Sequence, residues 1–214
     1  MHITKLGHCC LIIEISGLRI LTDPGKWTAE RHASIKNIDV ILITHDHSDH
    51  IHVESIKTIL QNNPQAKIYT NSGTGASLTK IGIAFETLEG TSKISIKDVE
   101  LEAFDCDHEV IYSSVPLPQN TGYWIGKALF YPGDSLTNPG RPVNILALPV
   151  TGPWMTIGQG IDYAKSVKPK KCFPVHDGYV KEGSLGVFHG LPQKMLAGAG
   201  IDFVPLKAGE STDF

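Results

Sequence analysis

The stretch DVILITHDHSDH, residues 39–50, joins an apolar segment to a dense group of titratable side chains. Its first half has only apolar residues between Asp39 and Thr44, which is typical of a β-strand covered on both faces. Its second half holds three histidines and two aspartates within six residues. Such density, after a buried strand and before a helix, favours a metal site over a solvated His-rich loop.

The spacing inside this stretch indicates how it binds metal. His45 and His47 lie two residues apart at the end of the strand, so their imidazoles can converge on one ion. Asp49 and His50 lie on the turn that follows and can face a second ion beside the first. A mixture of imidazole and carboxylate suits Zn, Mn or Fe better than Ca or Mg, which prefer oxygen ligands.

One loop cannot supply all the ligands of two metal ions, so we expect further ligands at the ends of other strands. Three residues follow apolar β segments in this way: His108 in FDCDHEV, Asp134 in LFYPGDS and His176 in CFPVHDG. Gly133 gives the backbone freedom for a sharp turn before Asp134. The shared context of the three residues is a stronger signal than any one of them.

The rest of the chain predicts two β-rich halves with helices after strands, and therefore two sheets with helices outside. Strands are expected at 2–6, 10–15, 18–23, 39–44, 66–70, 92–96, 99–104, 121–126, 128–133, 144–150, 171–175 and 201–206. Helices are expected at 53–62, 75–80, 158–169 and 192–197. Residues 121–133 predict a hairpin that turns at Gly126-Lys127. No linker or repeat is evident, so we expect a single domain over residues 1–214.

Composition limits the function classes. The 214 residues are 41% hydrophobic and 19% charged, with a net charge of −3. No basic block predicts binding to nucleic acid or to an anionic membrane, and no apolar run predicts a transmembrane helix. The four cysteines form no CxxC pair, which favours a reduced, cytoplasmic setting. The expected partner is a small-molecule substrate, and a homo-oligomer is left open.

The series THDHSDH (44–50), a separate His, GDS (133–135) and PVHDG (174–178) resembles the metallo-β-lactamase superfamily over essentially the whole chain. The opening ITKLGHCCLIIEISGLRILTDP (3–24) and the region 147–178 are similar to small stand-alone hydrolases of the L-ascorbate-6-phosphate lactonase type. This resemblance implies an α/β fold, a four-layer αββα sandwich with metals at one edge of the sheets. It assigns His45, His47 and His108 to one metal and Asp49, His50 and His176 to the other, with Asp134 bridging both.

The resemblance also implies a reaction. The HxHxDH motif matches the hydrolases rather than the HxExD pattern of related di-iron oxidoreductases. We expect two divalent ions, Zn or Mn with Fe allowed, and a bridging hydroxide that attacks a lactone or a phosphodiester. Asp134, Asp46 and Asp49 are the expected catalytic carboxylates. The alternatives are a metal-binding or sensing protein without catalysis and, less favoured, a di-iron redox protein.

Five further residues lie near these motifs, and three of them, Asp46, His8 and His189, are open to two interpretations each. Asp46 either orients an imidazole or relays a proton, or it binds backbone amides. We expect Asp23 to brace a ligand histidine. His8 contacts the substrate or a metal ligand, or is a buried core histidine. His189 contacts the substrate from a late loop or lies on the surface, and Asp177 stands where related lactonases often carry Tyr.

Overall fold

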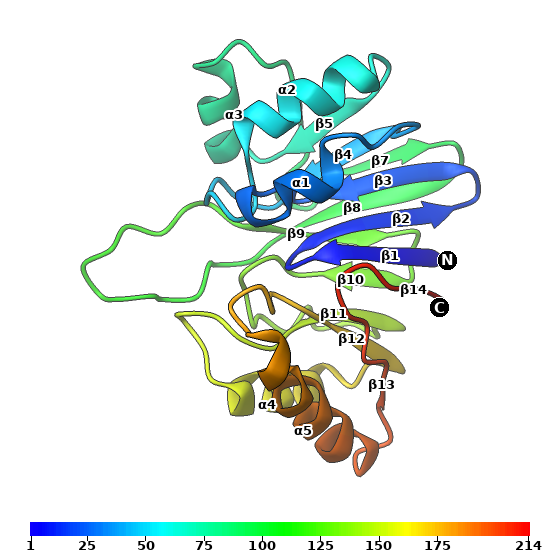
Figure 1. Cartoon of the computed structure of the whole chain (residues 1–214), viewed down its shortest axis with the longest axis vertical. Helices are drawn as coiled ribbons and strands as arrows, with labels where there is room; N and C mark the ends of the chain where they lie inside the picture. Colours follow the sequence, from blue (N-terminus) through cyan, green and yellow to red (C-terminus); the bar gives the residue numbers. More distant parts are fainter.

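The computed structural model describes residues 1–214 and contains two seven-stranded sheets that face each other (Figure 1). The first sheet has the order β14 (Ser211–Asp213), β1 (His2–Gly7), β2 (Cys10–Ile15), β3 (Leu18–Thr22), β4 (Val40–Ile43), β5 (Lys67–Thr70) and β6 (Glu86–Thr87). The second has the order β13 (Asp202–Phe203), β12 (Lys171–Val175), β11 (Ile145–Pro149), β10 (Leu129–Tyr131), β9 (Thr121–Ile125), β8 (Val99–Asp105) and β7 (Lys93–Ile96). Strands β3 to β6 and β10 to β13 pair in parallel, and their remaining neighbours pair antiparallel.

Helices cover the outer face of each sheet. Figure 1 shows α1 (Ala29–His32), α2 (Val53–Asn62) and α3 (Ser72–Thr79) beside the first sheet, and α4 (Ile157–Val167) and α5 (Leu185–Ala197) beside the second. Three buried apolar clusters lie between these layers. One of 22 residues lies between the two sheets, one of 12 residues lies beneath α1 to α3, and one of 14 residues lies beneath α4 and α5. The αββα sandwich expected from the sequence is therefore confirmed.

Strand β4, which leads into the histidine-rich stretch, is buried along its whole length. Val40 and Leu42 pack in the cluster between the two sheets, whereas Ile41 and Ile43 pack in the cluster beneath the helices of the first sheet. Successive side chains of a strand point to opposite faces, so a strand covered on both faces needs an unbroken apolar run. The residues that follow β4 therefore lie at one edge of the sandwich.

The hairpin between β9 and β10 turns where the sequence predicts. Gly126 and Lys127 both have positive φ values, +60° and +59°, and the Ala128 amide donates to the carbonyl of Ile125 at 3.2 Å, which closes the turn. Ile125 pairs with Leu129 across the hairpin. The turn sets the register of β10 and thereby the position of the GDS segment that follows it.

The C-terminal region differs from the prediction. Helix α5 begins at Leu185 rather than near residue 192, because burial of His189, Pro192 and Leu196 outweighs the poor helix propensity of its glycines and proline. The predicted strand at 201–206 is reduced to β13, and β14 was not predicted at all. Strand β14 pairs with β1, so the two chain ends lie side by side (Figure 1).

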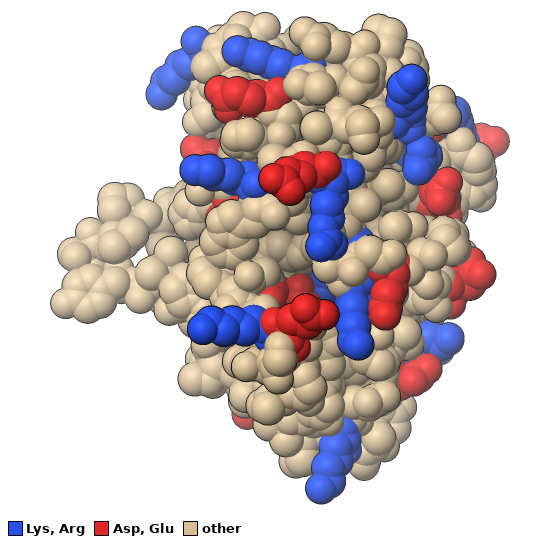
Figure 2. Space-filling view, viewed as in Figure 1, with Lys and Arg blue, Asp and Glu red and all other residues tan.

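The connection from β8 to β9, residues 106–120, projects from the body of the protein (Figure 1). Its residues 110–120 contain no Lys, Arg, Asp or Glu. In Figure 2 the projecting segment is uncoloured, whereas charges of both signs are interspersed over the rest of this face. None of the helices combines the length and the apolar character needed to cross a bilayer.

Candidate metal centre

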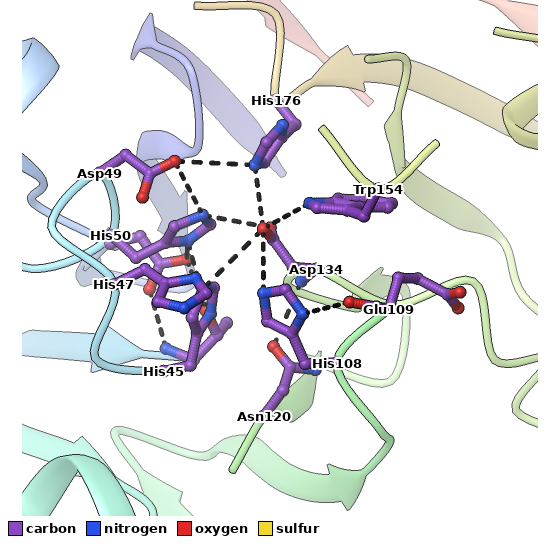
Figure 3. Close-up of polar contacts among 12 residues, drawn as sticks. His45, His47, Asp49, His50, His108, Glu109, Asn120, Asp134, Trp154 and His176 are labelled. Atoms are coloured by element: carbon purple, nitrogen blue, oxygen red, sulfur yellow. Dashed lines mark hydrogen bonds and ion pairs between the residues drawn. The ribbon is translucent and has the colours of Figure 1, made fainter. Parts of the chain in front are cut away.

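The side chains that the sequence singled out meet at one edge of the two sheets (Figure 3). Each comes from a segment that directly follows a strand: His45, His47, Asp49 and His50 after β4, His108 after β8, Asp134 after β10 and His176 after β12. They form two adjoining groups with the Asp134 carboxylate between them. The structure thus brings together all seven residues proposed as metal ligands.

The first group contains His45, His47, His108 and Asp134, whose candidate ligand atoms all lie within 4.8 Å of one another. Nε2 of His45 is 3.2 Å from Nδ1 of His47. Nε2 of His108 is 3.5 Å from Oδ2 of Asp134. Three imidazole nitrogens and a carboxylate oxygen are a donor set that Zn²⁺ and similar ions accept.

Hydrogen bonds fix which nitrogen each of these imidazoles offers. Thr44 Oγ1 donates to Asp23, so it accepts the Nδ1 proton of His45 at 2.9 Å. The Nδ1 of His108 donates to the carbonyl oxygen of Glu109 at 2.7 Å. Both rings therefore keep the Nε2 lone pair facing the group, an arrangement common among metal-ligating histidines.

The second group contains Asp49, His50 and His176. Nε2 of His50 is 3.1 Å from Oδ1 of Asp134, and Nε2 of His176 is 3.0 Å from Oδ2 of the same residue. Oδ2 of Asp49 is 3.9 Å and 3.8 Å from these two nitrogens. The Nδ1 of His50 donates to Asp23 at 2.8 Å, and that of His176 donates to the carbonyl of Thr151 at 2.6 Å.

Several of the converging atoms are buried without a hydrogen-bond partner. They are Nε2 of His50, His108 and His176, together with Oδ1 of Asp134. The short distances between them lack hydrogen-bond geometry, although buried polar atoms are nearly always paired. These atoms converge on the Asp134 carboxylate, so the donor set fits divalent cations.

Charge at the site is also arranged for cations. Burial by itself raises the pKa of Asp134, but His176 and His50 hold that pKa well below its usual range. Burial lowers the pKa of His45 well below its usual value, and the neighbouring His50 lowers it further. These shifts favour the ionised form of Asp134 and the neutral form of His45, the forms that bind metal. Burial lowers the pKa of His50, but Asp134 and Asp23 outweigh burial and raise that pKa well above its usual value, so a cation bound there must displace a proton from His50.

Asp23 braces both groups from beneath. Its fully buried carboxylate accepts hydrogen bonds from the Thr44 amide and hydroxyl, from Nδ1 of His50 and from the Tyr131 hydroxyl. It thus orients His50 directly and His45 through Thr44. This is the bracing position expected for Asp23, whereas Tyr131 was not identified from the sequence.

His8 supports Asp49. The Gly178 amide donates to Nδ1 of His8 at 3.1 Å, so Nε2 carries the proton and donates to Oδ2 of Asp49 at 3.2 Å. Burial and, to a smaller extent, the nearby His176 lower the pKa of His8 to about 4. Burial opposes ionisation of Asp49, but the hydrogen bond from His8 and the charge of His50 lower its pKa to about 2.

Two sequence-based assignments are wrong. Asp46 is exposed and its carboxylate accepts a hydrogen bond from Ser77 Oγ at 2.9 Å. It reaches neither an imidazole nor a backbone amide, because the turn between His45 and His47 directs it outward to α3. His189 is buried in α5 rather than placed on a loop or on the surface, and its Nε2 is 2.9 Å from Oδ2 of Asp177.

Asp177, the departure from the lactonase pattern, belongs to a buried ion pair. Lys5 Nζ donates to Oδ2 of Asp177 and to the carbonyl of Pro174, both at 2.7 Å. Both side chains are buried. Lys5 was not identified from the sequence, although the alternation of β1 places its side chain on the same face as that of the buried Ile3. The pair anchors the segment that follows His176.

Trp154 contacts the bridging carboxylate. Its indole Nε1 donates to Oδ2 of Asp134 at 2.9 Å. On the other side of Asp134, Gly133 has φ +65°, and a Cβ there would lie 2.3 Å from Oδ1 of Asn120. That amide oxygen accepts a hydrogen bond from the Asp134 backbone.

A cavity of about 380 Å³ lies beside His8 and the Asp177-Gly178 segment that follows His176. His8 and Trp27 form part of its wall, and Arg31 and Lys207 are cationic residues that line it. Trp27 also packs against Tyr179 in an edge-to-face arrangement, with ring centroids 4.4 Å apart. The cavity is of a size that accepts a small molecule.

Comparison with known proteins agrees with this site. Residues 2–176 match the family model of the beta-lactamase superfamily domain. The chain is 33% identical over 195 residues to Protein Rv0786c of Mycobacterium tuberculosis, covering 89% of this chain and 90% of that protein. It is 26% identical to a UPF0173 metal-dependent hydrolase of Carboxydothermus hydrogenoformans, covering 82% and 84%.

A solved structure shows the same fold. It is a Parabacteroides distasonis protein, described only provisionally as a metal-dependent hydrolase, and it superimposes with a TM-score of 0.78. The match covers 97% of this chain and 93% of that protein at 24% identity. It supports the fold alone.

Proposed function

The chain belongs to the metallo-β-lactamase superfamily of metal-dependent hydrolases, and we propose that it hydrolyses a small ester-like substrate, a lactone or a phosphodiester, at a centre of two divalent ions. The observation that carries this proposal is the position of Asp134. Its carboxylate lies within 3.5 Å of imidazole nitrogens from both groups, His108 on one side and His50 and His176 on the other.

In this proposal the ligands divide between two positions. His45, His47 and His108 hold the first ion, Asp49, His50 and His176 hold the second, and Asp134 contacts both. Divalent ions bound there supply Lewis acidity: they lower the pKa of water from about 15.7 to about 7 and polarise the oxygen of the scissile group. Zn²⁺ and Mn²⁺ both suit the His and Asp donors, and Fe is allowed.

The surrounding residues keep the donors in place. Trp154 holds one carboxylate oxygen of Asp134. Asp23 orients His50 directly and orients His45 through Thr44. His8 orients Asp49. Because these supports are buried, the donors are fixed before a substrate arrives, which reduces the cost of reorganisation during the reaction. Asp134 and Asp49 act through their carboxylates, whereas the placement of Asp46 gives it no part.

The cavity beside the second group is the proposed substrate site. Arg31 and Lys207 line it together with the apolar Leu6 and Leu185 and two carboxylates, Glu182 and Asp177, the latter paired with Lys5. A guanidinium and an ammonium group attract an anionic substituent such as a phosphate or a carboxylate. A small anionic lactone or phosphodiester is therefore the substrate class that these walls favour.

A substrate panel tests the proposal. Protein containing two equivalents of Zn²⁺ or Mn²⁺ is assayed on lactones, phosphodiesters and thioesters, and turnover of a lactone or phosphodiester is expected. A chelator should abolish it and added metal should restore it. Protein that binds two metals but turns over no member of the panel would contradict the proposal and favour a sensing role. An optical or EPR signature of a coupled iron pair would favour the redox alternative.

A further inference from the structure

Cys9 and Cys10 are adjacent in the sequence, but their side chains face opposite sides of the first sheet. Cys9 belongs to the apolar cluster between the two sheets, whereas Cys10 belongs to the cluster beneath the helices. Each is 1% exposed. Of the two thiols, only that of Cys9 is therefore on the side of the metal centre.

The Cys9 thiol lies in the second group of donors. Its sulfur and one ring nitrogen each of His8, His50 and His176 are all within 4.8 Å of one another. A thiolate and an imidazole on one zinc ion are at most about 4.4 Å apart, since the Zn–S and Zn–N bonds are about 2.3 and 2.1 Å long. The limit of 4.8 Å on the separations in this group is close to that value.

The hydrogen bonds decide which members of this group are free to bind metal. Both nitrogens of His8 are engaged, one by the Gly178 amide and the other by Asp49. Nε2 of His50 and Nε2 of His176 are buried and unpaired, and their Nδ1 atoms are held by Asp23 and Thr151. The Cys9 sulfur thus lies close to two imidazoles whose Nε2 atoms are open.

We propose that the Cys9 thiolate is a further protein ligand at the second metal position, beside Asp49, His50 and His176. The proposal rests on the two-metal centre of the proposed function but not on hydrolytic activity. On binding, the S–H bond breaks, the proton passes to solvent and a sulfur–metal bond forms. Thiolate is a soft donor that selects Zn²⁺ over Mn²⁺, so the second position is a zinc position.

Cobalt substitution tests the ligand directly. Co²⁺ replaces Zn²⁺ in such sites, and a thiolate bound to Co²⁺ gives an intense near-ultraviolet charge-transfer band that imidazole and carboxylate do not give. The band is expected in the wild-type protein loaded with two equivalents of Co²⁺. It should be lost in Cys9→Ser and retained in the matched control Cys10→Ser. It should also be retained in Cys106→Ser, which changes the cysteine two residues before His108.

Two results would overturn the proposal: no band in the wild-type protein, or a band that survives Cys9→Ser. The wild-type spectrum decides even if Cys9→Ser fails to fold. A second measurement is the competition between Zn²⁺ and Mn²⁺ for the second position. Cys9→Ser should weaken Zn²⁺ there at least about tenfold and leave Mn²⁺ binding unchanged, whereas equal loss of both ions would indicate a structural role.

The outcomes separate this proposal from the proposed function. A charge-transfer band in a protein that turns over no substrate would keep the thiolate ligand and refute the hydrolase activity. Turnover with two bound metals but without the band would keep the hydrolase activity and refute the thiolate ligand.

Discussion

The Nε2 of His8 donates to Oδ2 of Asp49 at 3.2 Å, and this bond joins the loop after β1 to the loop after β4. His8 is buried, with φ +50°. The strained backbone and the two hydrogen bonds of the ring hold the imidazole against a ligand of the second metal position. The consequences of this contact can be measured in stability and in metal affinity.

The first prediction concerns the pH dependence of the metal-free protein. The folded state holds the pKa of His8 at about 4, against 6.5 for the unperturbed side chain. As the pH falls from about 6.5 to about 4, the unfolded chain takes up this proton before the folded one does, so the folded state loses stability. The loss is roughly 3 kcal/mol over the window.

His8→Gln removes the titrating group and should reduce this loss. Urea denaturation of chelator-treated protein at pH values across the window measures it. Identical pH profiles for the wild type and His8→Gln would refute the assignment. In metal-loaded protein, the same variant should weaken the second metal position by roughly 10- to 100-fold.

The second prediction concerns Asp134. Asp134→Asn removes the charge that both groups share, so the metal content should fall below two and kcat should fall by more than about a hundredfold. Asp46→Asn is the control, because this exposed side chain contacts only Ser77. Its kcat should stay close to that of the wild type. Comparable losses in both variants, by steady-state kinetics and metal analysis, would argue against the bridging role.

The third prediction concerns the indole of Trp154. Trp154→Phe keeps the aromatic ring but removes the hydrogen bond to Asp134, so kcat should fall by roughly tenfold with both metals retained. Trp124 offers a matched control, since it is also buried and its Nε1 has no partner. Trp124→Phe should leave kcat unaffected. Steady-state kinetics with metal analysis would contradict this account if Trp154→Phe behaved like Trp124→Phe.

The fourth prediction concerns the buried pair of Lys5 and Asp177. Either Lys5→Met or Asp177→Asn leaves one buried charge without its partner and should lower the free energy of unfolding by about 3–5 kcal/mol. The double variant should cost less than the sum, since it removes both charges. The exposed pair of Lys67 and Glu86 is the control, and Lys67→Met should change stability little. Urea denaturation checks all of these, and additive losses would mean that the two side chains are not coupled.

The placement of the metal-binding residues could be predicted because the signal is local. His45, His108, Asp134 and His176 each follow an apolar β segment, and such segments end at the same edge of a layered α/β fold. The hairpin at Gly126-Lys127 was equally local. In each case a few neighbouring residues determine the backbone.

The supporting residues could not be predicted because their partners are distant in the chain. Lys5 pairs with Asp177, 172 residues away, and Trp154 reaches Asp134 across 20 residues. The prediction for Asp46 was wrong because it relied on sequence neighbours alone. Both neighbours of Asp46 are proposed metal ligands, but the turn directs its side chain away from them and toward Ser77. Helix α5 was shortened in the prediction because its glycines and Pro192 oppose a helix that tertiary packing stabilises.

The central claim is that two metal ions lie on either side of the Asp134 carboxylate. Anomalous diffraction from crystals of the metal-loaded protein, collected above and below the absorption edge of the bound metal, tests it most directly. The account predicts two anomalous peaks about 3.5–4 Å apart, one among His45, His47 and His108 and the other among Asp49, His50 and His176. A single peak, or peaks away from Asp134, would contradict it.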